Sequence, residues 1–207
     1  AWTVSPVFDK EGHIQSSSVI LISPWVNTRL VKPGEEPKSW RELLQPRWKG
    51  KISVSDPDID PVPVSMYYML VRKHGILDDA YFRELGKLTV FQPNTRENAA
   101  AVARGEIDIS FGSTPTSMAF VLQEGGPVKA IDMVEGITGS GAVAISPLSQ
   151  APHPNVARVF VNWLFSREGQ LIFHKAFGTE SVRQDVPSFL PAPGQLTLRA
   201  TSAEAGD

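Results

Sequence analysis

The chain has 207 residues, 42% of them hydrophobic and 20% charged, which fits one globular domain or two small ones and argues against an intrinsically disordered chain. The 20 Lys and Arg against 22 Asp and Glu leave a formal net charge of −2, so no basic excess favours a nucleic-acid partner. The sequence contains no Cys, which excludes disulfides, thiolate catalysis and Cys-ligated metal centres, and no apolar run approaches the roughly 18 residues of a membrane-spanning helix.

Residues 1–18 are predicted to form an N-terminal loop, because 9–12 is a turn sequence and 16–18 is a run of Ser. The start of the chain has neither the basic segment nor the apolar segment of a signal peptide, and it lacks an initiating Met. We therefore expect the chain to be a processed product or a fragment.

After this loop, short β-branched runs alternate with amphipathic stretches of roughly 10–14 residues. The β-branched runs predict strands. Many amphipathic stretches start at a capping residue or Pro and end at Gly, which is typical of helices, and Ser39 and Asp60 are two such predicted N-caps. The predicted strands cover 19–22, 51–54, 88–91, 107–111, 128–131 and 142–145, and the predicted helices cover 39–44, 61–73, 79–85, 95–104, 115–123, 154–165 and 167–177.

This alternation predicts an α/β domain with a mixed, mostly parallel sheet flanked by helices. Right-handed crossovers between parallel strands place the strand-to-helix loops at one edge of the sheet, where ligands bind in such folds. The loops 55–61, 92–95 and 112–115 are therefore expected to face one crevice.

Five sequence blocks carry a family resemblance. The longest are P-K-S-W-R-E-L-L-Q-P-R-W-K-G-K-I at 37–52 and H-P-N-V-A-R-V-F-V-N-W-L-F-S-R-E-G-Q at 153–170. The others are N-T-R-L-V at 27–31, V-A-R-G-E-I-D-I at 102–109 and S-V-R-Q-D-V at 181–186. In order and spacing these blocks resemble the extracellular solute-binding proteins of bacterial ABC importers, family 1 and its ferric-iron-binding-type group.

The resemblance implies a type II periplasmic-binding-protein-like lobe without enzymatic activity or cofactor. Such a protein captures a small polar solute in the periplasm, closes by a hinge motion and delivers the solute to an ABC permease in the membrane. The resemblance divides the chain into the N-terminal loop 1–18, the C-terminal-lobe core 19–126, the crossover strands and helices 127–177 that would pack on the first lobe, and the C-terminal segment and tail 178–207.

The chain resembles the part of the family that follows most of the first lobe. The helix predicted from Pro154 carries an apolar stripe that includes Phe160 and Trp163. We expect self-association, a swapped segment or a separate first lobe to cover this stripe, because exposed patches of this size usually mark an interface.

A ligand-sensing effector domain of a regulator is the alternative function, because it can share this fold. It would need a DNA-binding or signalling module outside this chain, so an upstream signal peptide or an upstream helix-turn-helix would distinguish the two. An enzyme ranks third, because no set of nucleophile, base and orienting residue is visible.

The ligand is expected at the helix N-termini of the crevice. Free backbone N–H groups there suit an anionic solute, and Arg96 adds positive charge, although ordinary helix capping also explains several of these polar residues. A cationic solute or a metal chelate also remains open. The predicted ligand-binding residues are Asp58, Asn94, Arg96, Ser113, Thr114 and Thr116.

No metal site is predicted. The alternating Asp residues of 56–60 resemble the start of an EF-hand calcium loop. Such a loop would need Gly at position 61 and Glu at position 67, where this sequence has Pro61 and Tyr67. Turn and cap roles are therefore preferred for these carboxylates.

The adjacent Tyr67 and Tyr68 resemble the tyrosine pair that binds ferric iron in part of the family, but that pair would fall at 115–116 here. With Val64 and Val71 they follow an i, i+3, i+4, i+7 spacing, which predicts core packing. Two Trp residues, Trp40 and Trp48, are likewise predicted to pack a short helix on the sheet.

Overall fold

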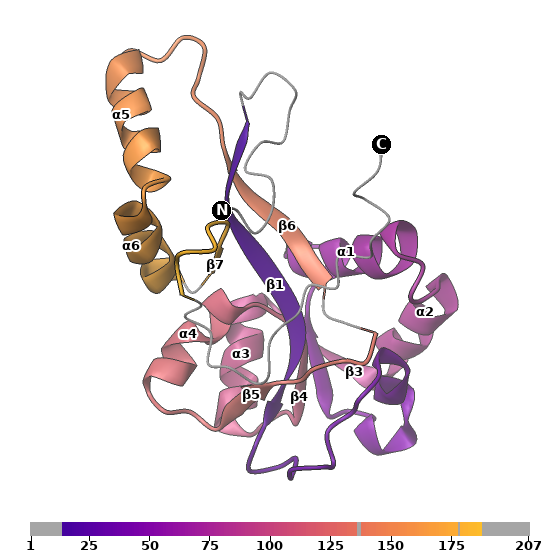
Figure 1. Cartoon of the computed structure of the whole chain (residues 1–207). Coiled ribbons are helices and arrows are strands. Elements are labelled where there is room, and N and C mark those ends of the chain that lie inside the picture. The colour runs from indigo at the N-terminus through magenta and orange to yellow at the C-terminus, as the bar shows by residue number, and fades with distance from the viewer. Residues whose placement is uncertain (1–13, 136–137, 178, 188–207) are drawn as a thin grey trace. The chain divides into compact units, whose positions relative to one another are not determined.

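The computed structural model describes residues 14–135, 138–177 and 179–187 (Figure 1). Within these ranges, residues 14–21 and 141–187 belong to one compact unit, unit 1, and residues 22–140 belong to a second, unit 2. None of the helices in the described ranges is long and apolar enough to cross a membrane.

A mixed sheet with the strand order β3-β2-β4-β1-β5 forms the centre of unit 2. Its strand β2 (Ile52–Ser55) pairs in parallel with β3 (Thr89–Gln92) and with β4 (Ile109–Ser113). The strand β1 (Gln15–Asn27) pairs antiparallel with β4 and with β5 (Val128–Ala130). The parallel pairs are those whose strands are joined through helices. The sheet is mixed, as predicted, but it is not mostly parallel, because β1 pairs antiparallel with β4, β5 and β7.

Helices cover both faces of this sheet. On one face, α3 and α4 bury small and aliphatic side chains against Trp25 and Val128. On the other, α1, α2 and the short helix Trp40–Leu44 bury their apolar side chains against Ile52, Ile109 and Phe111. Figure 1 shows the two helix pairs on opposite sides of the strands. The helices are α1 (Pro61–Tyr67), continued by a π-helical segment Tyr68–Lys73, α2 (Asp79–Leu88), α3 (Thr95–Arg104) and α4 (Pro115–Gln123).

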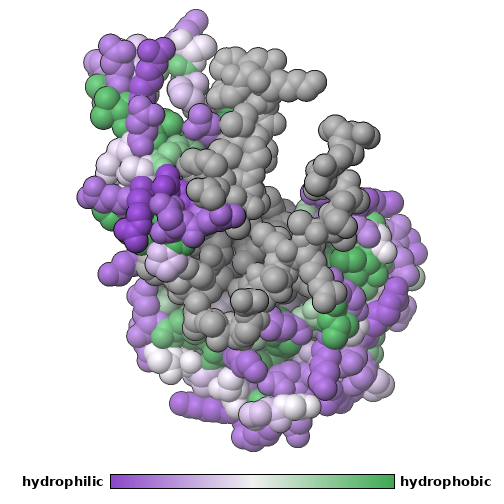
Figure 2. Space-filling model, in the orientation of Figure 1, coloured by the Kyte–Doolittle hydropathy of each residue, from purple (hydrophilic) through white to green (hydrophobic). Residues whose placement is uncertain are grey.

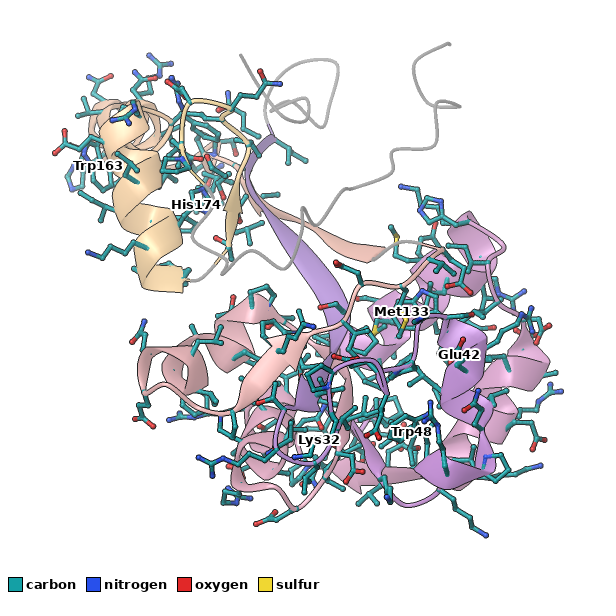
Figure 3. The ribbon with its side chains drawn as sticks, turned by 60° about the horizontal axis from the view of Figure 1, so that its bottom comes forward. Lys32, Glu42, Trp48, Met133, Trp163 and His174 are labelled. Carbon is teal, nitrogen blue, oxygen red and sulfur yellow. The ribbon has the colours of Figure 1, made fainter. Side chains whose placement is uncertain are left out.

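The two tryptophans pack as predicted. Trp40 is fully buried, with its ring edge-on to Phe111 at a centroid distance of 5.6 Å. The hydroxyl of Tyr81 donates a hydrogen bond of 2.7 Å to the carbonyl of Trp40. Trp48 is also buried in unit 2 (Figure 3). These contacts hold the short helix on the sheet face that α1 and α2 share.

Unit 1 contains the helices α5 (Pro154–Leu164) and α6 (Arg167–Phe177) and the short strand β7 (Glu180–Ser181), which pairs antiparallel with β1. The strand β6 (Thr138–Ile145) also pairs with β1. Gly169 lets the two helices meet closely, because a Cβ there would lie 2.1 Å from the carbonyl oxygen of Trp163.

A buried histidine lies at the centre of the polar contacts of unit 1 (Figure 3). His174 Nε2 lies 2.9 Å from Oε1 of Gln170, which also accepts a 2.6 Å hydrogen bond from the Ser181 hydroxyl. Its Nδ1 lies 2.8 Å from the Thr179 hydroxyl. Burial lowers the pKa of His174 to about 4, so this ring is neutral at physiological pH.

The core prediction for the tyrosine pair is correct for Tyr67 and wrong for Tyr68. Tyr67 is half-buried and its ring lies 5.3 Å from that of Phe82, whereas Tyr68 is 57% exposed. The predicted stripe lies one position away from the face that this helix buries, and its member Val64 is likewise 52% exposed. The side chains that this helix buries are Pro63, Met66 and Leu70.

Two expected boundaries also move. The strand β1 begins at Gln15, inside the segment expected to be loop, while residues 1–13 lie outside the described ranges. The resemblance placed a boundary between two parts of the chain after Gly126. In the structure the residues that follow still belong to unit 2, because β5 pairs with β1 and because Ile131 and Met133 are buried in its core.

Candidate ligand-binding site

Three strand-to-helix loops lie at one edge of the sheet of unit 2. The parallel register pairs Ser55 with Gln92 and Ser53 with Ser110, so the carboxyl ends of β2, β3 and β4 point the same way. The loops that lead into α1, α3 and α4 therefore share this edge, as predicted from the strand order.

The buried carboxylate of Asp60 connects two of these loops. Its Oδ1 accepts a 2.9 Å hydrogen bond from the backbone N–H of Val62, and thereby caps α1. Its Oδ2 accepts a 2.8 Å hydrogen bond from the N–H of Thr95 in the first turn of α3. One side chain thus fixes the starts of two helices relative to each other.

The start of α4 is held by a reciprocal capping box. The Thr114 hydroxyl accepts a 3.1 Å hydrogen bond from the N–H of Ser117, and the Ser117 hydroxyl accepts one of the same length from the N–H of Thr114. Pro115 occupies the first position of the helix and has no N–H to satisfy. These contacts fix the first turn of α4 without using the N–H of Thr116.

The first turns of α3 and α4 enclose a pocket of ≈ 360 Å³. Its charged group is Arg96, whose Cζ lies 5.8 Å from the ring centroid of Phe120. In the part of the chain that the structure describes, Arg96 forms no ion pair within 4 Å. The pocket is lined by Thr95, Arg96, Thr114, Thr116, Ser117 and Phe120.

Two backbone donors at this pocket are free. Asp60 and Asn94 satisfy the N–H groups of Thr95 and Glu97, but within the described ranges the N–H of Arg96 has no partner, and neither has the N–H of Thr116. The N-terminus of a helix carries a partial positive charge, so two such ends and one guanidinium favour a negatively charged group.

Three of the six predicted ligand-binding residues line this pocket, namely Arg96, Thr114 and Thr116. Asn94 lies beside it, where its side chain caps α3 by accepting the N–H of Glu97 at 2.9 Å. Ser113 is buried, hydrogen-bonded to the hydroxyl of Ser110, and does not line the pocket. Asp58 is exposed on the loop after β2 and does not line the pocket.

Sequence reasoning missed Thr95, Ser117 and Phe120 as pocket residues. The spacing of Ser117 from Thr114 is that of a capping box and was a usable signal. Phe120 lies one helical turn after Thr116 and therefore shares its face.

The buried Asn98 supports α3 beneath the pocket. Its Oδ1 accepts a hydrogen bond from the Ser53 hydroxyl of β2, and its Nδ2 donates one of 3.4 Å to the carbonyl of Phe111 in β4. A polar side chain on the inner face of α3 thus joins the helix to two parallel strands.

The aspartates after β2 have the turn and cap roles predicted for them. The carboxylate of Asp56 accepts a 2.9 Å hydrogen bond from the N–H of Asp58, and that of Asp60 caps two helices. In the described ranges no group of three or more His, Cys, Asp or Glu is placed to hold a metal ion.

Residues 6–177 match the family described as bacterial extracellular solute-binding protein. A relative from Haemophilus influenzae, described as an uncharacterized protein, is 30% identical in an alignment of 171 residues that covers 77% of this chain and 47% of the relative. The chain thus spans about half the length of the curated relative it matches.

The fold is similar to that of the periplasmic binding protein AfuA from Actinobacillus pleuropneumoniae, solved with fructose-6-phosphate bound. The TM-score is 0.71 at 21% identity, covering 91% of this chain and 60% of AfuA. It is also similar to FutA from Trichodesmium, solved with iron and citrate, with a TM-score of 0.72 at 20% identity over 90% of this chain and 62% of FutA. At these identities the likeness concerns the fold, which is that of type II periplasmic binding proteins.

Proposed function

The chain belongs to the family of bacterial extracellular solute-binding proteins, and from this we propose that it is the substrate-binding component of a bacterial ABC importer, or the C-terminal lobe of that component. The family consists of solute-binding proteins, and the structural neighbour AfuA is a periplasmic binding protein. In this proposal the protein works in the periplasm, captures a small anionic solute and delivers it to a membrane permease.

The pocket between α3 and α4 carries the proposal. It combines the guanidinium of Arg96 with the N–H groups of Arg96 and Thr116, which have no hydrogen-bond partner among the described residues. A phosphate or carboxylate oxygen seated there would accept charge-assisted hydrogen bonds, which are stronger than those between neutral groups. No described acidic side chain forms an ion pair with this guanidinium.

Two proteins of similar fold support this chemistry. AfuA was solved with fructose-6-phosphate, and FutA with iron and citrate. Both fructose-6-phosphate and citrate carry anionic oxygens. We infer that this chain takes a solute of the same kind, with a phosphate or carboxylate group between the two helix N-termini.

Binding at a lobe edge also explains how a transporter could recognise the loaded protein. A solute that touches both lobes of a two-lobed binding protein binds the closed state more tightly than the open state, and therefore shifts the protein toward the closed state. In this chain the contacts from one side would come from the first turns of α3 and α4. A permease that docks only to the closed state would then act on loaded protein.

Thermal unfolding of the chain with added solutes tests the proposal. Fructose-6-phosphate, citrate and inorganic phosphate are compared with neutral fructose at equal concentration and ionic strength. We expect at least one anion to raise Tm while fructose leaves it unchanged. Equal stabilisation by fructose would contradict the proposal that the ligand is a free anionic solute. Stabilisation by ferric citrate without any effect of citrate would also contradict it.

A further inference from the structure

Phe120 differs from the other residues that line the pocket between α3 and α4, because its side chain can neither donate a conventional hydrogen bond nor carry charge. The other lining residues all have polar side chains. Phe120 is 36% exposed, so the core does not fully account for it. Its ring centroid lies 5.8 Å from Cζ of Arg96, which is within the range of a cation–π contact. The aromatic residue of the pocket thus contacts the charged group of the pocket.

The core of unit 2 fixes the backbone of Phe120 relative to the helix that carries Arg96. The neighbours of Phe120 in α4, Met118 and Val121, are buried in one cluster with Val102 of α3. The two helices are therefore packed together beneath the pocket. The ring extends from a position that is held in place whether or not a solute is bound.

A contact with an aromatic ring restrains an arginine without neutralising it. A free arginine side chain samples many rotamers, and ordering it when a solute binds costs free energy. A carboxylate partner would also restrain Arg96, but it would offset the positive charge and occupy the N–H donors that an anion needs. Within the described ranges the guanidinium of Arg96 forms no ion pair, and it contacts the uncharged ring of Phe120.

The carboxylate of Asp60, beside the first turn of α3, is committed to the backbone. One of its oxygens accepts the N–H of Val62 and the other accepts the N–H of Thr95. This carboxylate therefore leaves the guanidinium of Arg96 to the pocket.

We propose that Phe120 is a positioning residue of the anion site: its ring holds the guanidinium of Arg96 at the pocket before the solute arrives. The inference rests on the proposed function, because that function supplies the anion that Arg96 binds. Phe120 raises the affinity for the anion through Arg96, without contributing a hydrogen bond to the solute.

NMR titration of the full chain with inorganic phosphate and with citrate tests this role. Neither probe has a ring that could stack on Phe120. We expect Phe120→Leu to weaken binding by about threefold, the effect of one exposed cation–π contact. Phe120→Tyr keeps an aromatic ring and should bind as the unaltered chain does. Phe91→Leu is the matched control, since it removes an exposed ring of unit 2 that does not line this pocket, and it should also leave binding unchanged.

A double-mutant cycle shows whether Phe120 acts through Arg96. In the Arg96→Gln background, Phe120→Leu should cause no further loss of affinity. A threefold loss in both backgrounds would overturn the inference, since Phe120 would then act without Arg96. Unchanged affinity of the single variant Phe120→Leu would overturn it as well.

The solute-free chain supplies a readout that does not depend on binding. The ring current of Phe120 should shift the resonances of the Arg96 side-chain protons upfield. Phe120→Leu should abolish this shift and Phe120→Tyr should keep it, and absence of the shift in the unaltered chain would overturn the inference.

Failure of the inference and failure of the proposed function give different results. Binding that Arg96→Gln weakens and Phe120→Leu does not would overturn only the role of Phe120. Absence of binding of both probes to the unaltered chain would overturn the anion site, and the role of Phe120 with it.

Discussion

The carboxylate of Asp60 accepts a hydrogen bond from the backbone N–H of Thr95 at 2.8 Å, across 35 positions of sequence. The same carboxylate caps α1 through the N–H of Val62. This contact fixes the loop after β2 against the first turn of α3, where the proposed anion site begins.

Replacing Asp60 with Ala should destabilise unit 2 by about 1–2 kcal/mol, because both helix starts lose a capping acceptor. Urea unfolding followed by circular dichroism measures this change. Asp58→Ala is the matched control, since Asp58 is exposed on the same loop and its removal should leave the unfolding midpoint nearly unchanged. Equal midpoints for the two variants would show that the Asp60 contacts contribute little.

The buried His174 should make stability depend on pH in the acidic range. Burial lowers the pKa of its folded form to about 4, below the ordinary value of about 6.5 for the unfolded chain. Between these values the unfolded chain binds more protons, so the free energy of unfolding should fall as pH drops from about 6.5 to about 4, by up to about 3 kcal/mol.

Urea unfolding at pH 7, 5.5 and 4 measures the effect of His174. The variant His174→Gln cannot titrate and should lose this part of the pH dependence, although it is less stable at pH 7 through the loss of the contacts with Gln170 and Thr179. An identical pH profile for the variant and the unaltered chain would assign the effect to other groups.

The apolar stripe on α5 should be covered in solution. Val156, Val159 and Phe160 are 67%, 69% and 54% exposed, and Trp163 is 38% exposed, and Figure 2 shows hydrophobic residues at the surface along α5. Full burial of such side chains stabilises by roughly 1.5–3 kcal/mol each. We expect analytical ultracentrifugation to show self-association, or a complex with a separate first lobe, that Phe160→Glu weakens. A stable monomer with no other polypeptide present would contradict this.

Removal of either tyrosine hydroxyl should leave solute binding nearly unchanged. Tyr67 bonds to Asp79 and Arg72, Tyr68 is exposed, and neither lines the pocket at Arg96. Tyr67→Phe and Tyr68→Phe are compared with the unaltered chain by calorimetric titration of the same anion. An affinity loss of about tenfold, or 1.4 kcal/mol, in either variant would place a tyrosine in the site.

Local chemistry made much of the fold predictable. The predicted N-caps Ser39 and Asp60 marked helix starts that the structure confirms, because a capping side chain acts within three residues of itself. The shared loop edge followed from strand–helix alternation, which also led to Arg96 and Thr116. These inferences needed no knowledge of contacts between distant residues.

Contacts between distant residues were beyond such reasoning. The role of Asp60 toward Thr95 depends on two parallel strands, β2 and β3, lying side by side. Tyr68 was misplaced because the predicted apolar stripe is one position away from the buried face of Pro63, Met66 and Leu70.

Calorimetric titration of the most stabilising anion into the unaltered chain, Arg96→Gln and Arg83→Gln tests the proposed site most directly. Both variants remove one exposed positive charge from unit 2, but only Arg96 lines the pocket between α3 and α4. We predict that Arg96→Gln weakens binding by about tenfold or more, as expected for loss of a charge-assisted contact, while Arg83→Gln binds like the unaltered chain. Equal affinity in all three proteins would contradict an anionic solute held at Arg96.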